Sequence, residues 1–158
     1  MWPVVTLKVG MSHTSGVHME LRIILQLLLA LVLGGLIGWE RWRDHKEAGV
    51  RTHALVAFGS TLFSLISIFG LEKFSHGAPV EVSRIMSNIV TGIGFLGAGM
   101  IVLRDGRVRG LTTAAGLWVC AGIGMAIAVE WYIVSIVSSL IVVLTFQIMG
   151  RLFPNGHH

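Results

Sequence analysis

The chain has 158 residues, of which 54% are hydrophobic and only 13% are charged, and its formal net charge is +4. A soluble domain is about one quarter charged, and its core helices carry polar faces at helical spacing, which the long uncharged stretches of this chain lack. Composition therefore excludes a soluble globular protein. It also excludes nucleic-acid binding, which needs a basic patch on a soluble surface.

Five apolar stretches follow one another along the chain, each close to the roughly 20 residues that cross a bilayer as a helix. We place them at residues 21–39, 52–69, 85–103, 111–129 and 131–149. The last two are separated by little more than Glu130, so they must form an antiparallel hairpin. The sequence thus predicts an all-α fold, an integral membrane bundle of about five transmembrane helices.

Two tails flank this transmembrane domain of residues 21–150. Residues 1–20 do not match a secretory signal peptide, and we interpret them as a tail that is disordered or foreign to the native chain. Residues 151–158 form the second tail, in which His157 and His158 resemble the remnant of a purification tag. We therefore assign no metal site to them.

The basic residues predict the orientation of the bundle. One side receives Arg41, Arg43, Lys46, Arg51, Arg104, Arg107, Arg109 and Arg151. The other side receives Lys8, Arg22, Lys73 and Arg84. Because loops rich in Lys and Arg face the cytoplasm, we expect the N-terminus outside and the C-terminus inside.

Small residues at four-residue spacing predict where the helices pack, because helices in lipid associate through close backbone approach. The first span carries Gly34 and Gly38. The fourth span carries a longer stripe of Thr112, Gly116, Cys120, Gly124 and Ala128. The third span carries Asn88, Thr91, Gly92, Gly94, Gly97, Ala98 and Gly99. We expect a tight contact between the third and fourth spans that also involves the first.

Several roles remain open for these residues. The glycines either only let the backbones approach, or they permit a break or a water-lined kink in the third span. We expect Asn88 near the interior, bonded across helices or in contact with an ion or solute, and Cys120 as a free buried thiol. No Asp or Glu lies in the middle of any span, which counts against ion-coupled transport.

Three segments carry a more specific pattern. The first is GGLIGWER at 34–41, followed by AGVRTHALV at 48–56. The second runs from Arg84-Ile85 to GIGFLGAG at 92–99, which contains Phe95. The third is RGLTTAAGLW at 109–118, which ends on Trp118. In order and spacing these segments resemble the bacterial MgtC/SapB family over residues 21–149.

The resemblance implies an inner-membrane protein linked to survival in low magnesium and to virulence. It further implies a protein that restrains the F-type ATP synthase rather than one that carries magnesium itself. Longer family members have a soluble C-terminal domain, whereas this sequence ends just after the fifth span. The resemblance therefore does not carry over functions that need that domain.

Four charged residues mark one end of the predicted bundle: Glu40, Arg41, Arg51 and Arg109. They could form an ion-pair network between loops, hold lipid phosphates by bidentate contact, or simply extend to the interface as topology determinants. We expect Thr112 and Thr113 to cap the start of their helix. This charged face is where we expect a partner to dock.

Catalysis has little support, because the sequence contains no nucleophile elbow, no Walker loop and no paired intramembrane acids. We expect a non-enzymatic protein without cofactor or bound metal. The leading hypothesis is a regulator of another membrane complex, with the ATP synthase as the candidate. The alternatives are a conduit for magnesium or another solute, and a lipid-responsive factor. The GxxxG-type surfaces predict a homodimer.

Overall fold

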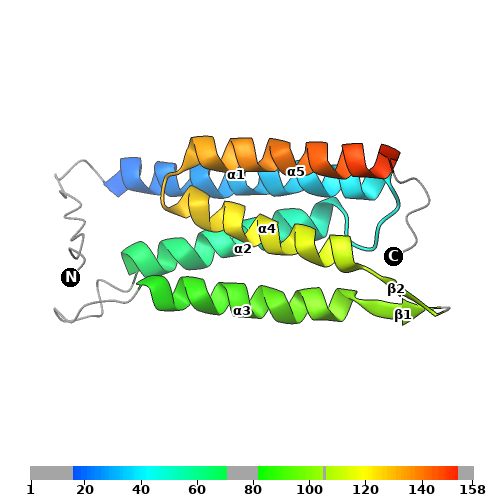
Figure 1. The fold of residues 1–158 in the computed structure, drawn as a ribbon. Helices are drawn as coiled ribbons and strands as arrows, with labels where there is room; N and C mark the ends of the chain where they lie inside the picture. Colours follow the sequence, from blue (N-terminus) through cyan, green and yellow to red (C-terminus); the bar gives the residue numbers. More distant parts are fainter. Residues whose placement is uncertain (1–15, 71–81, 105, 153–158) are drawn as a thin grey trace, which may run out of the picture.

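The computed structural model describes residues 16–70, 82–104 and 106–152. Successive α-helices run in opposite directions through one elongated bundle (Figure 1). They are α1 (Gly16–Arg43), α2 (Val50–Leu65), α3 (Val82–Met100), α4 (Leu111–Ala128) and α5 (Tyr132–Leu152). A π-helical turn, η1 (Ile66–Gly70), continues α2. The strands β1 (Val102–Arg104) and β2 (Arg107–Arg109) form an antiparallel hairpin between α3 and α4. The predicted all-α bundle is confirmed.

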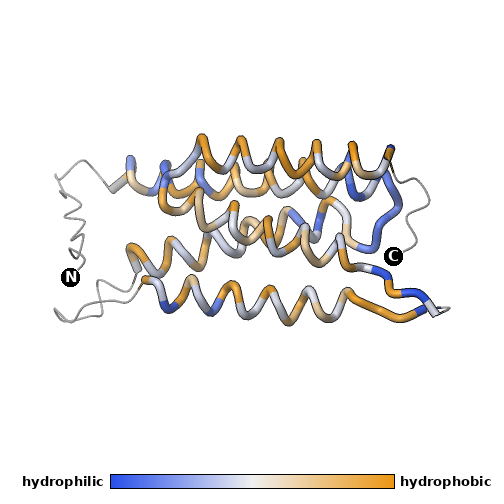
Figure 2. Tube along the Cα trace, in the orientation of Figure 1, coloured by the Kyte–Doolittle hydropathy of each residue, from blue (hydrophilic) through white to orange (hydrophobic). Residues whose placement is uncertain are grey.

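Within the described ranges, four helical segments are long and apolar enough to cross a membrane: Val17–Arg43, Val50–Gly70, Leu111–Ala128 and Tyr132–Leu152. Helix α3 is 19 residues long but does not join this group, because Arg84, Asn88 and several glycines dilute its apolar character. The hydrophilic segments gather at the ends of the bundle, most densely beside the hairpin (Figure 2). The protein is a multi-pass membrane protein.

The third predicted span, 85–103, is wrong at its end. Helix α3 stops at Met100, and Val102 begins the hairpin, in which Leu103 pairs with Val108. The Asp-Gly pair at 105–106 is a two-residue hairpin signal, and Gly106 has φ +73°. The boundary of the N-terminal tail also moves, because α1 begins at Gly16. The remainder of that tail and residues 153–158 lie outside the described residues.

Helices α1 and α4 end in the same way, although neither uses glycine. After α1, the amides of His45 and Lys46 donate to the carbonyls of Trp42 and Arg41 at 3.1 Å. His45 has φ +54°. This is the Schellman arrangement, in which a residue in the left-handed region lets the last carbonyls be satisfied.

After α4, the amides of Glu130 and Trp131 donate to the carbonyls of Ile127 and Ala126 at 3.0 and 2.9 Å. Glu130 has φ +66°. The short link therefore turns the chain directly into α5, as the predicted helical hairpin requires.

The glycines of α1 contact α2. A Cβ at Gly34 would lie 2.6 Å from the carbonyl oxygen of His53, and one at Gly38 would lie 2.7 Å from that of Gly49. These distances leave no room for a side chain, so α1 and α2 meet backbone to backbone.

The stripe on α4 also packs mainly on α2 and not on α3. A Cβ at Gly124 would press on the backbone of Ala57 and lie 3.0 Å from Cβ of Ser60. The predicted contact of α3 with α4 does form, at Gly97 against Ala114. The expectation that the small-residue surfaces join the third and fourth spans is therefore only partly right, because the closest approaches involve α2.

The core lies between α1, α2 and α4. Its buried members are Ala30, Leu33, Ile37, Ala57, Cys120, Ile123 and Ile127. Cys120 is a free, fully buried cysteine. Helix α3 is continuous from Val82 to Met100, so the break considered for the third span does not occur. The irregular helical turn is instead η1.

Candidate functional site

A buried arginine occupies the end of the bundle where α1 meets α4. Arg41 lies in the last turn of α1 and is 4% exposed. Its Nη2 donates to Oγ1 of Thr112 at 3.0 Å and to Oγ1 of Thr113 at 3.2 Å. These threonines therefore bind Arg41 and do not cap their own helix, whose N-cap residue is Gly110 without any side-chain cap bond.

The contacts of Arg41 extend to a second helix and a loop. Its guanidinium carbon lies 4.4 Å from the centroid of the Phe146 ring, which comes from α5. Such a cation over an aromatic face is attracted by the ring quadrupole. The Thr113 hydroxyl that accepts from Arg41 donates in turn to Oε2 of Glu47 at 3.0 Å. The chain Arg41–Thr113–Glu47 thus ties α1, α4 and the α1–α2 link together.

Glu47 lies outside the helices, and its ionised form is favoured there. Its own backbone amide and the Thr113 hydroxyl lower the pKa of the Glu47 carboxyl below 4.5, and Lys46 and Arg41 act in the same direction. Hydrogen bonds donated to a carboxylate stabilise the charged form. The link therefore presents a carboxylate at neutral pH to a cluster that we name the arginine centre, which consists of Arg41, Thr112, Thr113 and Phe146.

His53 is a further member of this centre, and the sequence pattern did not identify it. It is fully buried in the first turn of α2, and its Nδ1 lies 2.9 Å from the carbonyl oxygen of Gly49. Because a carbonyl only accepts, Nδ1 carries the proton. The other ring nitrogen, Nε2, has no hydrogen-bond partner in the described part of the chain. A Cβ at Gly116 would lie 3.2 Å from it. The signal in the sequence was its place inside the segment AGVRTHALV at 48–56.

Glu40 is also buried, at 4% exposed, and both of its carboxylate oxygens are unpartnered within the described residues. Arg51 and Arg109 lie on the surface. Among the residues that the structure describes, no ion pair joins Glu40, Arg41, Arg51 or Arg109. The ion-pair network considered for them is therefore not formed there, and Arg41 is held by hydroxyls and an aromatic ring.

The surface around this centre is strongly basic. The hairpin carries Arg107 and Arg109, both exposed, next to Arg104. Arg43 and Arg51 are exposed on the neighbouring helices. Figure 2 shows this as the most hydrophilic end of the molecule. We name this surface the basic end: Arg43, Lys46, Arg51, Arg104, Arg107, Arg109 and Arg151.

The residues expected inside the third span lie mainly on its outer surface. Exposed positions of α3 are Asn88, Thr91, Gly92, Gly94, Phe95 and Gly99, whereas Gly97 is buried. Asn88 is therefore not near the interior. Thr91 donates to the Ser87 carbonyl of its own helix at 3.2 Å. The exposed polar face of α3 is explained by the position of α3 at the side of the bundle, packed on α4 (Figure 1).

Asn88 lines a groove of about 690 Å³ between α2 and α3. The α2 side contributes Arg51, Thr52 and Ser60, and the remainder is mostly apolar. A groove with a few polar residues in an otherwise apolar lining is typical of small-ligand sites.

The residues expected on α4 divide by face. Thr113, Gly116 and Cys120 are buried, whereas Thr112 and Trp118 are exposed. Thr113 and Gly116 belong to the arginine centre, and Cys120 belongs to the core. In the described ranges, no group of three or more His, Cys, Asp or Glu residues could hold a metal ion.

Comparison with known proteins matches residues 27–153 to the model of the MgtC family. A protein of Escherichia coli K12 named putative magnesium transporter YhiD is 40% identical over 137 residues, which cover 85% of this chain and 63% of that protein. Protein MgtC of Salmonella typhimurium LT2 is 50% identical over 102 residues, which cover 65% of this chain and 41% of that protein. Protein SrpB of Synechococcus elongatus is 37% identical over 135 residues, covering 80% of this chain and 74% of that protein. The chain thus spans less than two thirds of the first two relatives. No solved structure matches it.

Proposed function

The chain belongs to the MgtC family, and from that premise we propose that it is a non-enzymatic inner-membrane protein that acts by binding another membrane complex through its basic end. The observation that supports this most directly is the arginine hairpin. Arg107 and Arg109 are exposed on a two-stranded element, and this element is anchored between two helices. A rigid array of guanidinium groups suits planar, bidentate recognition of carboxylates or phosphates.

The arginine centre supports the same proposal, because it fixes the base of the hairpin. Arg41 holds the first turn of α4 through Thr112 and Thr113, and β2 ends only two residues before that turn. A partner that contacts the basic end would meet a surface whose geometry is set by α1, α4 and α5. Preorganised contacts lose less entropy on binding.

The F-type ATP synthase is the partner that we propose, as the family resemblance implies. Under this proposal the basic end faces the cytoplasm, in agreement with the rule that basic loops stay on that side. Acidic surface on the partner would complement the arginines. Regulation of the synthase would then connect the protein to growth in low magnesium and to virulence.

The test is co-reconstitution of the purified protein with the synthase in proteoliposomes, with co-purification and ATP-driven proton pumping as readouts. We expect the protein to bind the synthase and to lower its pumping rate. Arg107→Gln and Arg109→Gln should each reduce the binding and restore part of the pumping. Arg84→Gln is the matched control, because Arg84 is an exposed arginine at the start of α3, at the opposite end of the bundle (Figure 1). Unchanged pumping together with no co-purification would reject this partner.

A magnesium conduit is the second candidate, and two observations favour it. One relative carries the name putative magnesium transporter, and the groove between α2 and α3 contains Asn88. Hydrated Mg²⁺ is bound by oxygen ligands, and the amide oxygen of Asn88 together with Thr52 and Ser60 would provide some. Magnesium flux into dye-loaded proteoliposomes that is lost in Asn88→Leu would favour the conduit. No magnesium flux, in an experiment in which a known channel gives flux, would reject the conduit.

A further inference from the structure

A crevice lies at the end of the bundle opposite the basic end, between α1 and the start of α5. Its volume is about 390 Å³, within the range of about 300–1,000 Å³ of small-ligand sites. Leu21, Leu25 and Leu29 line it at helical spacing, and Tyr132 lies on the α5 side. The crevice is therefore mainly apolar along its length.

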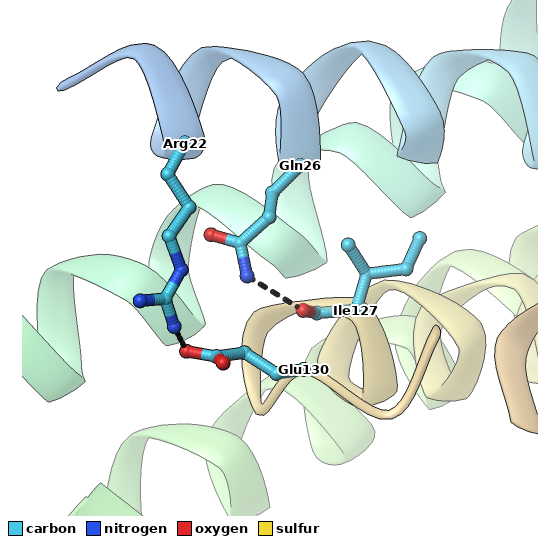
Figure 3. Close-up of polar contacts among 4 residues, drawn as sticks. All are labelled: Arg22, Gln26, Ile127 and Glu130. Atoms are coloured by element: carbon cyan, nitrogen blue, oxygen red, sulfur yellow. Dashed lines mark hydrogen bonds and ion pairs between the residues drawn. The ribbon is translucent and has the colours of Figure 1, made fainter. Parts of the chain in front are cut away.

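Its polar lining includes His18, Arg22 and Gln26, and Gln26 is incompletely bonded. Gln26 is 3% exposed, and its Nε2 donates to the Ile127 carbonyl at 2.9 Å. Its Oε1 is buried and has no partner in the described part of the chain. Figure 3 shows this oxygen turned away from Ile127, on the side of Arg22. A buried acceptor left unpaired is costly, so a hydrogen-bond donor is expected to meet it.

Arg22 forms an ion pair with Glu130 beside this crevice (Figure 3). The two side chains are 50% and 44% exposed, and exposed pairs of this kind are weak enough to open. Glu130 holds the left-handed position after α4, with φ +66°. Glycine usually occupies such a position, whereas here the residue carries a carboxylate that faces Arg22. Next to it, Trp131 is 63% exposed, and tryptophans in membrane proteins gather at the headgroup level.

We propose that this crevice binds one phospholipid with a primary-amine headgroup. The phosphate pairs with the guanidinium of Arg22, and the ammonium donates to the carboxylate of Glu130 and to Oε1 of Gln26. One acyl chain lies along Leu21, Leu25 and Leu29.

The opposed charges select this headgroup class. An anionic phosphatidylglycerol would pair with Arg22 but give Glu130 no cation. A phosphatidylcholine carries a cation without N–H groups, so it cannot donate to Gln26. Free phosphate has no acyl chain that could contact the three leucines. Among these candidates, only a phosphate and a primary ammonium on one apolar anchor satisfy Arg22, Glu130 and Gln26 together.

The experiment places the full chain in nanodiscs containing equal amounts of phosphatidylethanolamine, phosphatidylcholine and phosphatidylglycerol, then measures the lipid retained after transfer to detergent by native mass spectrometry. We expect phosphatidylethanolamine to be retained about tenfold over the other two. Glu130→Gln and Gln26→Leu should each reduce this preference at least about threefold. Arg22→Gln should reduce retention of every phospholipid.

The matched control is Arg84→Gln. Arg84 is an exposed arginine at the start of α3 and does not line the crevice, so its removal should leave the headgroup preference unchanged. Retention without headgroup preference, or an undiminished preference in Glu130→Gln and Gln26→Leu, would overturn the proposal and leave the ion pair as a link between α1 and the α4–α5 turn. Displacement of the lipid by equimolar soluble glycerophosphoethanolamine would overturn the role of the acyl chain.

Discussion

The guanidinium of Arg41 stacks on the ring of Phe146 with 4.4 Å between its central carbon and the ring centroid. The two residues are more than a hundred positions apart in the chain and belong to the first and last helices. A charged group inside a membrane protein needs partners, and here the partners are a ring and two hydroxyls. The contact joins the first and last helices at the basic end of the bundle.

Substitution of Arg41 tests this centre. We expect Arg41→Gln to lower the free energy of unfolding by about 2 kcal/mol, because charge-assisted hydrogen bonds contribute about 1.5–3 kcal/mol. Arg41→Lys should rescue only part of this, because an ammonium cannot bond two hydroxyls and stack on a ring in the same way. Denaturant titration in detergent measures the effect, and Arg43→Gln, at an exposed site, should change stability little.

The close approach of α1 and α2 gives a second prediction. Gly34→Ala and Gly38→Ala should each destabilise the protein by about 1–3 kcal/mol, because the added methyl group meets backbone atoms that cannot move aside. Gly92→Ala is the control, since a Cβ there has nothing within 4 Å. Equal melting temperatures for Gly34→Ala and Gly92→Ala would contradict the packing of α1 on α2.

The hairpin gives a third prediction, from two glycines with positive φ. Gly110 has φ +86°, and a Cβ there would collide with the Met100 carbonyl, whereas Gly106 has φ +73° and open space. Gly106→Ala should cost about 1–2 kcal/mol of backbone strain. Gly110→Ala should cost more and displace the hairpin. Comparison of the two melting temperatures, with proteolysis at Arg107 and Arg109 as a second readout, measures the difference.

Glu47 gives a prediction on pH. Since its folded pKa lies below its ordinary 4.5, ionised Glu47 stabilises the fold above pH 4.5. This contribution is lost as pH falls through the folded pKa, because the carboxyl is then protonated in the folded as well as in the unfolded state. Thr113→Val should raise the pKa of Glu47 towards 4.5 and weaken the acid dependence of stability. NMR titration of the Glu47 carboxyl checks both statements, and an unshifted pKa in Thr113→Val would contradict the hydrogen bond.

Much of the architecture was predictable from the sequence for a simple physical reason. Uncharged stretches of bilayer length must be helices, because lipid offers no partner for a free backbone amide. The five helices, the tight α4–α5 hairpin and the family pattern around Arg41 and Arg109 followed from this local information. The hairpin was not predicted: the apolar residues before the Asp-Gly pair at 105–106 suggested more helix, although that pair is itself a hairpin signal.

The packing partners were decided only by the tertiary structure. A stripe such as Gly116 and Gly124 indicates a close approach but not its partner. Gly124 meets the backbone of α2, whereas Gly116 meets the side chains of His53 and Phe146. The same limit placed Asn88 wrongly, because hydropathy does not distinguish a helix at the side of a bundle from one at its centre.

The burial of Arg41 and His53 was likewise invisible in the sequence, since both stand near span boundaries where charged groups usually reach water. Their environment depends on Thr113 and Phe146, which lie 72 and 105 positions beyond Arg41 in the chain. Local sequence determines which segments become helices in a membrane. Only the three-dimensional arrangement determines which polar groups on those helices find each other, because that choice depends on contacts between distant residues.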